Sequence, residues 1–161
     1  AQAAYDAAYA LGLQATIIDD ALVGEAALLA PRLLERALAE PLGPPKLLIW
    51  AGEPTVTLGE RAGRGGRNQE LALAALCALT QGPEASRSVA FASLGTDGTD
   101  GPTDAAGAII TSAMRDQRSV VAWQRALAEH DAYPTLEALG ALVKTGPTRT
   151  NVNDLILVLV V

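Results

Sequence analysis

The sequence is poor in the residues that covalent cross-links and zinc sites require. Its 161 residues include one cysteine and one histidine. A single cysteine excludes an internal disulfide, and a single histidine leaves no cluster for zinc. No apolar run approaches the roughly 20 residues of a membrane span, and no charged and then apolar signal peptide opens the chain. We therefore expect a cytoplasmic protein without a membrane partner.

Basic residues are also scarce, because 12 lysines and arginines stand against 18 aspartates and glutamates and leave a net charge of −6. This balance argues against a nucleic-acid partner, which usually leaves a basic footprint, and a bound phosphate would need a local basic site. Half of the residues are apolar and 19% are charged, which is a globular composition of one-domain length. The opening Ala-Gln-Ala-Ala-Tyr has no Met and reads as mid-helix, so we expect a piece of a longer protein.

Three aliphatic runs set the expected fold. Residues 46–51, 88–94 and 155–161 show no polar alternation, which is typical of strands covered on both faces. We predict an α/β fold with a mixed or largely parallel sheet flanked by helices, and with these runs in the interior of the sheet. Further strands are expected at 15–18 and, after a break at Gly52-Glu53-Pro54, at 55–58, while 105–111 fits a strand or a helical turn before a strand. Apolar periodicity and end signals predict helices at 1–11, 24–39, 69–80, 120–129 and 135–142.

An acidic loop at 95–104 follows the second aliphatic run and contains Asp97, Asp100 and Asp104. Binding crevices of open α/β sheets lie beyond the carboxyl ends of strands, so these carboxylates are candidates for holding a hard cation or orienting a hydroxyl. A calcium loop beginning at Asp97 would place Ala108 at the position of the twelfth-residue glutamate, which excludes an EF-hand. The alternative is that Asp, Gly and Thr supply turns and a helix cap.

A glycine- and arginine-rich loop at 59–67 runs directly into an apolar helix. Glycines can turn several backbone N–H groups toward one anion, and a helix N-terminus favours negative charge. Arg61, Arg64 and Arg67 are suited to grip phosphate or carboxylate oxygens, although the loop lacks the Lys-Ser/Thr ending of a P-loop. The alternative is a mobile, solvated loop. We expect this loop, the acidic loop and residues 146–154 to share one edge of the sheet and one cleft.

Other polar positions allow two interpretations. Glu70 suits the dipole of the helix that it opens, but beside a phosphate it would need an intervening cation, and Glu53 raises the same question at a strand end. Asn and Asp in 148–154 can form caps and turns or contact a ligand. Cys77 is interpreted as core packing, and His130, at the polar end of a helix, as solvated.

Four motifs in order resemble the MOFRL domain, the C-terminal part of the type-2 glycerate kinases, a family also labelled hydroxypyruvate reductase. They are Gly52-Glu53 with Thr55-Val56, residues 65–70 (GGRNQE), residues 95–107 (GTDGTDGPTDAAG), and Gly146-Pro147-Thr148 with residues 150–154 (TNVND). Ala51 and Arg149 depart from the pattern expected of the family. The resemblance covers about residues 46–158, and residues 1–40 resemble the end of the family's N-terminal domain.

The resemblance implies an ATP-dependent kinase that phosphorylates the 2-hydroxyl of D-glycerate with Mg²⁺ in a cleft between two α/β domains. It divides the chain into residues 1–40, a fragment of the N-terminal domain, and residues 46–161, the MOFRL domain. The rest of the N-terminal domain, which carries a lysine proposed as catalytic in the family, would be a missing partner. The oligomeric state stays open.

The resemblance also suggests roles for individual residues. Arg67 would stabilise the transferring phosphoryl group or hold the substrate carboxylate, and Asp97 would act with it in catalysis. Asp97, Asp100 and Asp104 are the metal-ligand candidates. Substrate or nucleotide contacts are expected from Glu53, Gly65, Gly66, Asn68, Glu70, Thr96, Thr99, Thr148, Asn151 and Asn153.

Two other functions remain open. The first is an NAD(P)H-dependent hydroxypyruvate reductase, although no Gly-x-Gly-x-x-Gly opens a helix with an acidic residue about 20 positions on. The second is a non-catalytic binding or assembly module.

Overall fold

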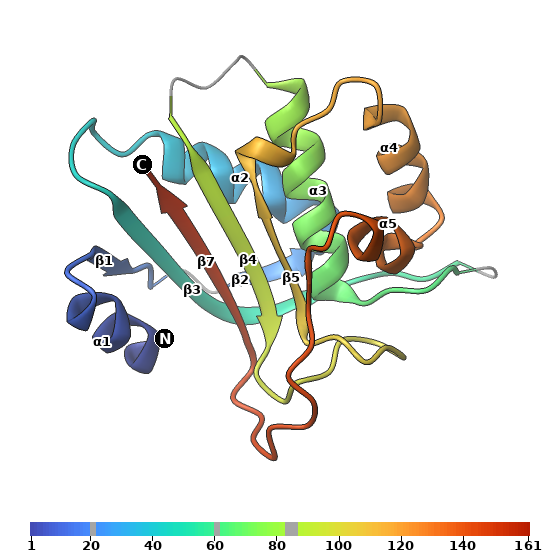
Figure 1. Ribbon diagram of the computed structural model, residues 1–161. Helices are drawn as coiled ribbons and strands as arrows, with labels where there is room; N and C mark the ends of the chain where they lie inside the picture. Colours follow the sequence, from blue (N-terminus) through green and yellow to red (C-terminus); the bar gives the residue numbers. More distant parts are fainter. Residues whose placement is uncertain (20–21, 60–61, 83–86) are drawn as a thin grey trace.

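The computed structural model describes residues 1–161 except residues 20–21, 60–61 and 83–86 (Figure 1). Arg61 therefore lies outside the described residues. The helices are α1 (Gln2–Ala10), α2 (Ala26–Leu38), α3 (Arg67–Gln81), a 3-10 turn (Ser112–Met114), α4 (Val120–Ala128) and α5 (Ala132–Ala138). The strands are β1 (Gln14–Ile17), β2 (Leu22–Glu25), β3 (Lys46–Thr55), β4 (Val89–Gly95), β5 (Gly107–Thr111), β6 (Leu142–Val143) and β7 (Asp154–Val160).

All strands join one mixed sheet in the order β1-β3-β7-β4-β5-β6, with β2 pairing alongside the second half of β3. β1 and β2 run parallel to β3, whereas the β3–β7, β7–β4, β4–β5 and β5–β6 pairs are antiparallel. The predicted mixed α/β fold is confirmed, and the three aliphatic runs lie in β3, β4 and β7 at the interior of the sheet. The antiparallel pairs outnumber the parallel ones, so the sheet is not largely parallel.

The main core lies where α2 and α3 cover one face of this sheet (Figure 1). Leu48, Phe91 and Val158 contribute to it from the three interior strands, and α3 contributes from nearly its whole circumference because α2, α4 and α5 also pack against it. Cys77 lies in this core, as predicted, and its burial raises the thiol pKa to about 11. The second face of β7 is only half-buried, so the expectation that this strand is covered on both faces is wrong.

Several element boundaries differ from the sequence prediction. β3 is one continuous strand, because β7 ends its pairing opposite Gly52 and Pro54 lies beyond the last antiparallel pair, where no β7 partner needs its missing N–H. The last two residues of β2, Gly24 and Glu25, were predicted as the start of the helix at 24–39. The helix predicted at 135–142 instead spans Ala132–Ala138 and gives way to β6, and residues 107–111 form β5.

Among the residues that the structure describes, no helix combines the length and the hydrophobicity that crossing a membrane requires.

Candidate functional site

The site lies at the edge of the sheet where β3 and β4 end and β7 begins. Asp154, the first residue of β7, pairs with Gly52 on one side and with Gly95 on the other. Antiparallel pairing therefore brings the segments after β3 and β4 and the segment before β7 to the same edge. This is the place where the sequence analysis expected the polar loops to meet.

The three loops contact one another directly. The N–H of Thr148 donates to the carbonyl of Asp97 at 3.0 Å, and the Thr96 hydroxyl donates to the carbonyl of Asn153 at 2.7 Å. Gly101, at φ +59°, packs so closely that an added Cβ would lie 2.2 Å from the Gly65 carbonyl oxygen. The predicted common edge is confirmed for the described parts of these loops.

The N-terminus of α3 is capped by the protein's own carboxylate. Asp100 accepts hydrogen bonds from the N–H groups of Asn68 at 3.0 Å and Gln69 at 2.8 Å, one on each carboxylate oxygen. Asp100 is 3% exposed, and this burial raises its pKa. The prediction that this helix end serves a ligand anion is therefore wrong for these two N–H groups, and the capping interpretation holds for Asp100.

Polar side chains behind this cap bond one another inside the core, although Oε1 of Gln69 is buried without a hydrogen-bond partner among the described residues. Asn68 accepts a 2.6 Å hydrogen bond from the Ser93 hydroxyl, and Gln69 donates to the Thr103 hydroxyl at 2.9 Å. Asn68 is fully buried, so it supports the site from behind and does not face a ligand. This agrees with the general rule that buried polar groups are hydrogen-bonded.

Arg67 opens α3 and is held by Asp154. Its Nε and Nη2 donate to the two carboxylate oxygens, the Nη2 bond measuring 2.9 Å, and this pairing raises the arginine pKa. Asp154 is 1% exposed, so it requires such a partner, whereas Arg67 remains part-exposed. The two hydrogen bonds to Asp154 fix the Nε and Nη2 side of the guanidinium and leave Nη1 for a ligand.

A cleft of about 860 Å³ lies beside this arginine. Its wall includes the end of β3, the Gly/Arg loop, the first turn of α3 and the acidic loop, and its charged or titratable members are Glu53, Arg67, Glu70 and His130. Gly65, Gly66, Gly101 and Pro102 also line it. Thus Glu53, Gly65, Gly66, Arg67 and Glu70 line the cleft. Residues 146–154 contact the acidic loop without lining the cleft, so the prediction that all three loops share one cleft is wrong for these residues.

His130 belongs to this cleft, contrary to the prediction that it is solvated. Its Nδ1 lies 2.9 Å from Oε2 of Glu70, and its side chain is 22% exposed. The two residues are 60 positions apart, and His130 stands between α4 and α5 at φ +52°. Sequence periodicity carries no signal for such a pairing.

The turn between α4 and α5 also fixes the Gly/Arg loop. Asp131 accepts the N–H of Arg64 at 2.8 Å, and the N–H of Gly63 donates to the carbonyl of Glu129 at 2.8 Å. The Arg64 guanidinium lies 3.6 Å above the centre of the Tyr133 ring. The described part of this loop is therefore anchored by these contacts, which oppose a mobile loop, while Ala62, Gly63 and Arg64 stay exposed to solvent as the alternative expected.

The three candidate metal ligands lie in three different settings. Asp97 accepts the N–H of Thr99 at 3.0 Å in a local turn, and Asp100 caps α3. Asp104 points to Tyr133 and Lys144, which lower its pKa by hydrogen bonding. Within the described ranges no group of three or more His, Cys, Asp or Glu side chains is placed to hold a metal ion. The expected cluster is not formed, and we derive no step through a metal.

The remaining candidates lie between the acidic loop and residues 146–154. The Thr148 hydroxyl donates to the carbonyl of Thr96, and Asn151 accepts the N–H of Asn153 at 3.2 Å. The Thr148 hydrogen bond stabilises the contact between the two loops, and the Asn151 hydrogen bond stabilises a turn within residues 146–154. Sequence reasoning also missed Asp154 as a site residue, although a carboxylate at the start of an aliphatic strand signals a buried, paired charge.

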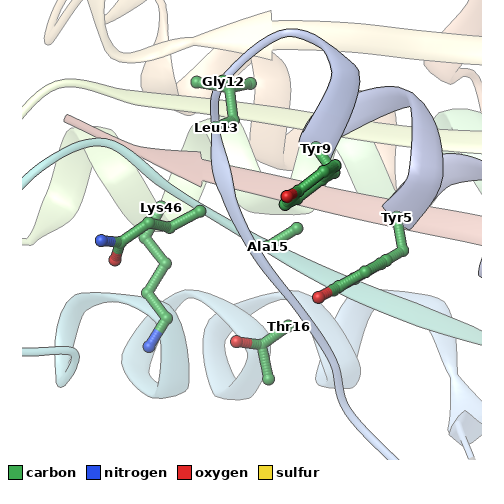
Figure 2. A pocket seen from close by; sticks show the side chains of 8 residues that line it. Tyr5, Tyr9, Gly12, Leu13, Ala15, Thr16 and Lys46 are labelled. Atoms are coloured by element: carbon green, nitrogen blue, oxygen red, sulfur yellow. The ribbon is translucent and has the colours of Figure 1, made fainter.

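A second hollow of about 730 Å³ lies at the opposite end of β3 (Figure 2). Figure 2 shows the rings of Tyr5 and Tyr9 from α1 across from Thr16 and Lys46. Lys46 begins β3, so at roughly 3.3 Å per residue it is about 23 Å along the strand from Glu53. This hollow is therefore separate from the cleft.

The fold and the cleft define an α/β domain with a cleft at one end of its central strands. The MOFRL family model matches residues 46–154, and the chain belongs to the MOFRL family.

Named relatives cover nearly the whole chain. The glycerate 2-kinase of Pyrococcus horikoshii is 38% identical over 93% of this chain, and a crystal structure of glycerate kinase from Thermotoga maritima aligns over 99% with a TM-score of 0.84 and 40% identity. An Agrobacterium vitis relative with a provisional hydroxypyruvate reductase name is 40% identical over 99%. The alignments cover 34%, 39% and 37% of these three proteins, so the chain spans little more than a third of their length.

Proposed function

We propose that this chain is the C-terminal part of a glycerate 2-kinase, which transfers a phosphoryl group from ATP to the 2-hydroxyl of D-glycerate. The observation that carries the proposal is the 40% identity to the Thermotoga maritima glycerate kinase structure over 99% of the chain. The cleft beside Arg67 supports it, because transfer between two anionic substrates depends on positioning and charge neutralisation.

Arg67 supplies the fixed positive charge in this proposal. Asp154 holds its guanidinium from a buried position, so the arginine needs little reorganisation when charge develops on a bound phosphoryl group. Glu53 and Glu70 also line the cleft, and their negative charges oppose anion binding. A further cation from the preceding domain, or Mg²⁺ brought with ATP, would balance them. Asp97, on the nearby acidic loop, is the proposed second catalytic group.

We also propose that residues 1–40 end the N-terminal domain and that residues 46–161 form the MOFRL domain. The family model begins at residue 46, and the relatives are much longer than this chain. β2 pairs in parallel with the last four residues of β3, and its Val23 lines the cleft, so the preceding domain would be tied to the sheet next to the cleft. In this arrangement the preceding domain closes over the cleft and excludes water from it.

A reductase function has one observation in its favour, the provisional name of the Agrobacterium vitis relative. The structure offers a physical argument against a dinucleotide at α3, because Asp100 already occupies the N–H groups of Asn68 and Gln69. A pyrophosphate would normally use such groups.

The test is to assay the full-length protein with D-glycerate and ATP and, separately, with hydroxypyruvate and NADH. We expect phosphorylation in the first assay and no NADH oxidation in the second. NADH oxidation without phosphorylation would refute the proposal in favour of the reductase, and inactivity in both assays would favour the binding or assembly module.

A further inference from the structure

We propose that His130 contacts the substrate in this cleft, with Nε2 of its imidazole accepting a hydrogen bond from a substrate hydroxyl, and that Glu70 is the residue that positions it. The inference rests on the proposed function, because it assigns part of the site to a small hydroxy acid.

Glu70 requires a hydrogen-bond donor. It is 5% exposed on the first turn of α3, and a buried carboxylate without a partner is costly. His130 Nδ1, 2.9 Å from Oε2, fills this need when it carries the proton. A carboxylate at one ring nitrogen thereby sets the tautomer of the neutral imidazole.

With the proton on Nδ1, Nε2 presents a lone pair. Among the residues that the structure describes, none forms a hydrogen bond with Nε2. Nε2 is also not among the buried polar atoms that lack a partner, so it is accessible from outside the protein. Since His130 lines the cleft, the natural partner of Nε2 is a donor on a ligand. In the neutral form, the lone pair on Nε2 matches a hydroxyl donor and not an anionic oxygen.

The backbone holds this ring in place from both sides. His130 has φ +52°, which is unfavourable for a residue with a Cβ, and it persists because the surrounding structure fixes it. The N–H of Asp131 donates to the carbonyl of Ala126 at 2.7 Å, and the Asp131 carboxylate binds the N–H of Arg64. The imidazole therefore reaches the cleft from a preorganised turn.

The decisive variant is His130→Asn in the full-length protein. The Asn amide can still donate to Glu70 in place of Nδ1 but has nothing at the position of Nε2, so folding is retained while the ligand contact is lost. We expect an unchanged melting temperature, an unchanged KM for ATP and a KM for D-glycerate raised about 10-fold, the scale of one hydrogen bond. Glu129→Gln is the matched control, since Glu129 is the neighbouring residue and its side chain pairs with Arg125 outside the cleft.

Two analogues test the hydroxyl contact by calorimetric binding. 3-Hydroxypropanoate lacks the 2-hydroxyl of D-glycerate, and D-lactate lacks the 3-hydroxyl. In the wild type, one of these analogues should bind about 10-fold more weakly than D-glycerate, and His130→Asn should abolish that difference. Discrimination that survives unchanged in His130→Asn for both analogues overturns the proposal, and so does a variant whose only defect is a lower melting temperature.

The binding experiment separates this proposal from the proposed function. A wild type that binds D-glycerate in a His130-dependent way but does not phosphorylate it refutes the kinase and supports the histidine contact. An active kinase whose KM for D-glycerate is unchanged by His130→Asn refutes the histidine contact alone. A wild type that neither binds nor phosphorylates D-glycerate refutes both.

Discussion

The two ends of β3 differ in where their carboxylates lie and which segments they bind. At the end near Thr55, Asp100, Asp154 and Glu70 are almost fully buried, and each has a partner from a distant segment. At the end near Lys46, Glu40 pairs with its sequence neighbours Arg36 and Lys46, and the second hollow is lined by α1, where Tyr9 is 75% exposed. Burying carboxylates costs free energy that an apolar core would not require, so their concentration at one end marks the edge where function constrains the fold.

The largest expected effect is on turnover, and it belongs to the cleft end alone. In the full-length protein, Arg67→Ala should lower kcat roughly 100-fold or more, because a preorganised charge is lost. It also leaves Asp154 buried without its cation, so thermal melts must accompany the kinetics. Lys46→Ala, at the other end of β3, should leave kcat unchanged. Near-wild-type turnover for Arg67→Ala would remove this arginine from the site.

The same comparison applies to the chain by itself. We expect residues 1–161 alone to have no measurable glycerate kinase activity, because half of the proposed cleft would belong to the preceding domain. Steady-state assays of the segment and the full-length enzyme, at equal concentration, check this. Full activity of the segment would contradict the fragment interpretation.

Two glycines sharpen the comparison through stability. Gly101 (φ +59°) and Gly12 (φ +75°) have similar backbones, but an added Cβ meets the Gly65 carbonyl at Gly101 and nothing within 4 Å at Gly12. Gly101→Ala should therefore cost about 3 kcal/mol, and Gly12→Ala about 1 kcal/mol from the backbone alone. Urea unfolding of both variants measures the two losses of stability. Equal losses would mean that the two loops can move apart at Gly101 without a free-energy penalty.

Two aspartates four residues apart should respond to pH in opposite directions. Burial raises the pKa of Asp100 above its ordinary 3.8, so its contribution to stability falls as pH rises through the folded-state value. Tyr133 and Lys144 lower the pKa of Asp104, so its contribution is present above 3.8 and is lost as pH falls through the folded-state value.

Urea unfolding of Asp100→Asn and Asp104→Asn between pH 3 and 7 tests this pair. Asp100→Asn should lower the free energy of unfolding by about 2 kcal/mol at neutral pH, because the amide keeps one acceptor oxygen and its NH₂ group faces the other N–H of α3. This loss of stability should grow toward acid pH. The deficit of Asp104→Asn should instead vanish toward acid. Parallel pH profiles of the two variants would contradict the assignment.

The smallest expected effect comes from a phenol. Tyr133→Phe removes a hydroxyl that donates to Asp104 at 2.7 Å and accepts from Lys144 at 2.7 Å, so it should cost about 1 kcal/mol. Tyr9→Phe, on the exposed helix α1, should be neutral. Thermal melts distinguish the two variants. An unchanged melting temperature for Tyr133→Phe would mean that the hydrogen bonds of Tyr133 with Asp104 and Lys144 do not stabilise the fold.

The sequence allowed the sheet interior to be predicted because continuous aliphatic runs have few other uses. It did not specify strand direction, since an aliphatic run such as 155–161 reads the same in parallel and antiparallel pairing. It also did not predict β2, because this strand has only four residues and the last two were assigned to the following helix.

The site was predicted where chemistry is local and missed where it is not. Arg67 and Glu70 stand in one recognisable motif and line the cleft together. The partners of Glu70 and Asp100 come from segments 60 and 32 positions away, and only the folded chain decides those pairings. The three candidate aspartates do not form one cluster because residue type does not specify side-chain direction, and metal binding by any one of them stays a prediction.

The position of β7 has a consequence for synthesis on the ribosome. β3 and β4 lie close in the chain yet do not pair, because β7 separates them, and its residue Val160 pairs with both Lys46 and Val89. A nascent chain that has emerged only as far as β5 therefore has two unjoined half-sheets with apolar edges. These contacts span most of the sequence and form slowly. We therefore expect the edges of β3 and β4 to be open to aggregation until residues 154–160 clear the exit tunnel.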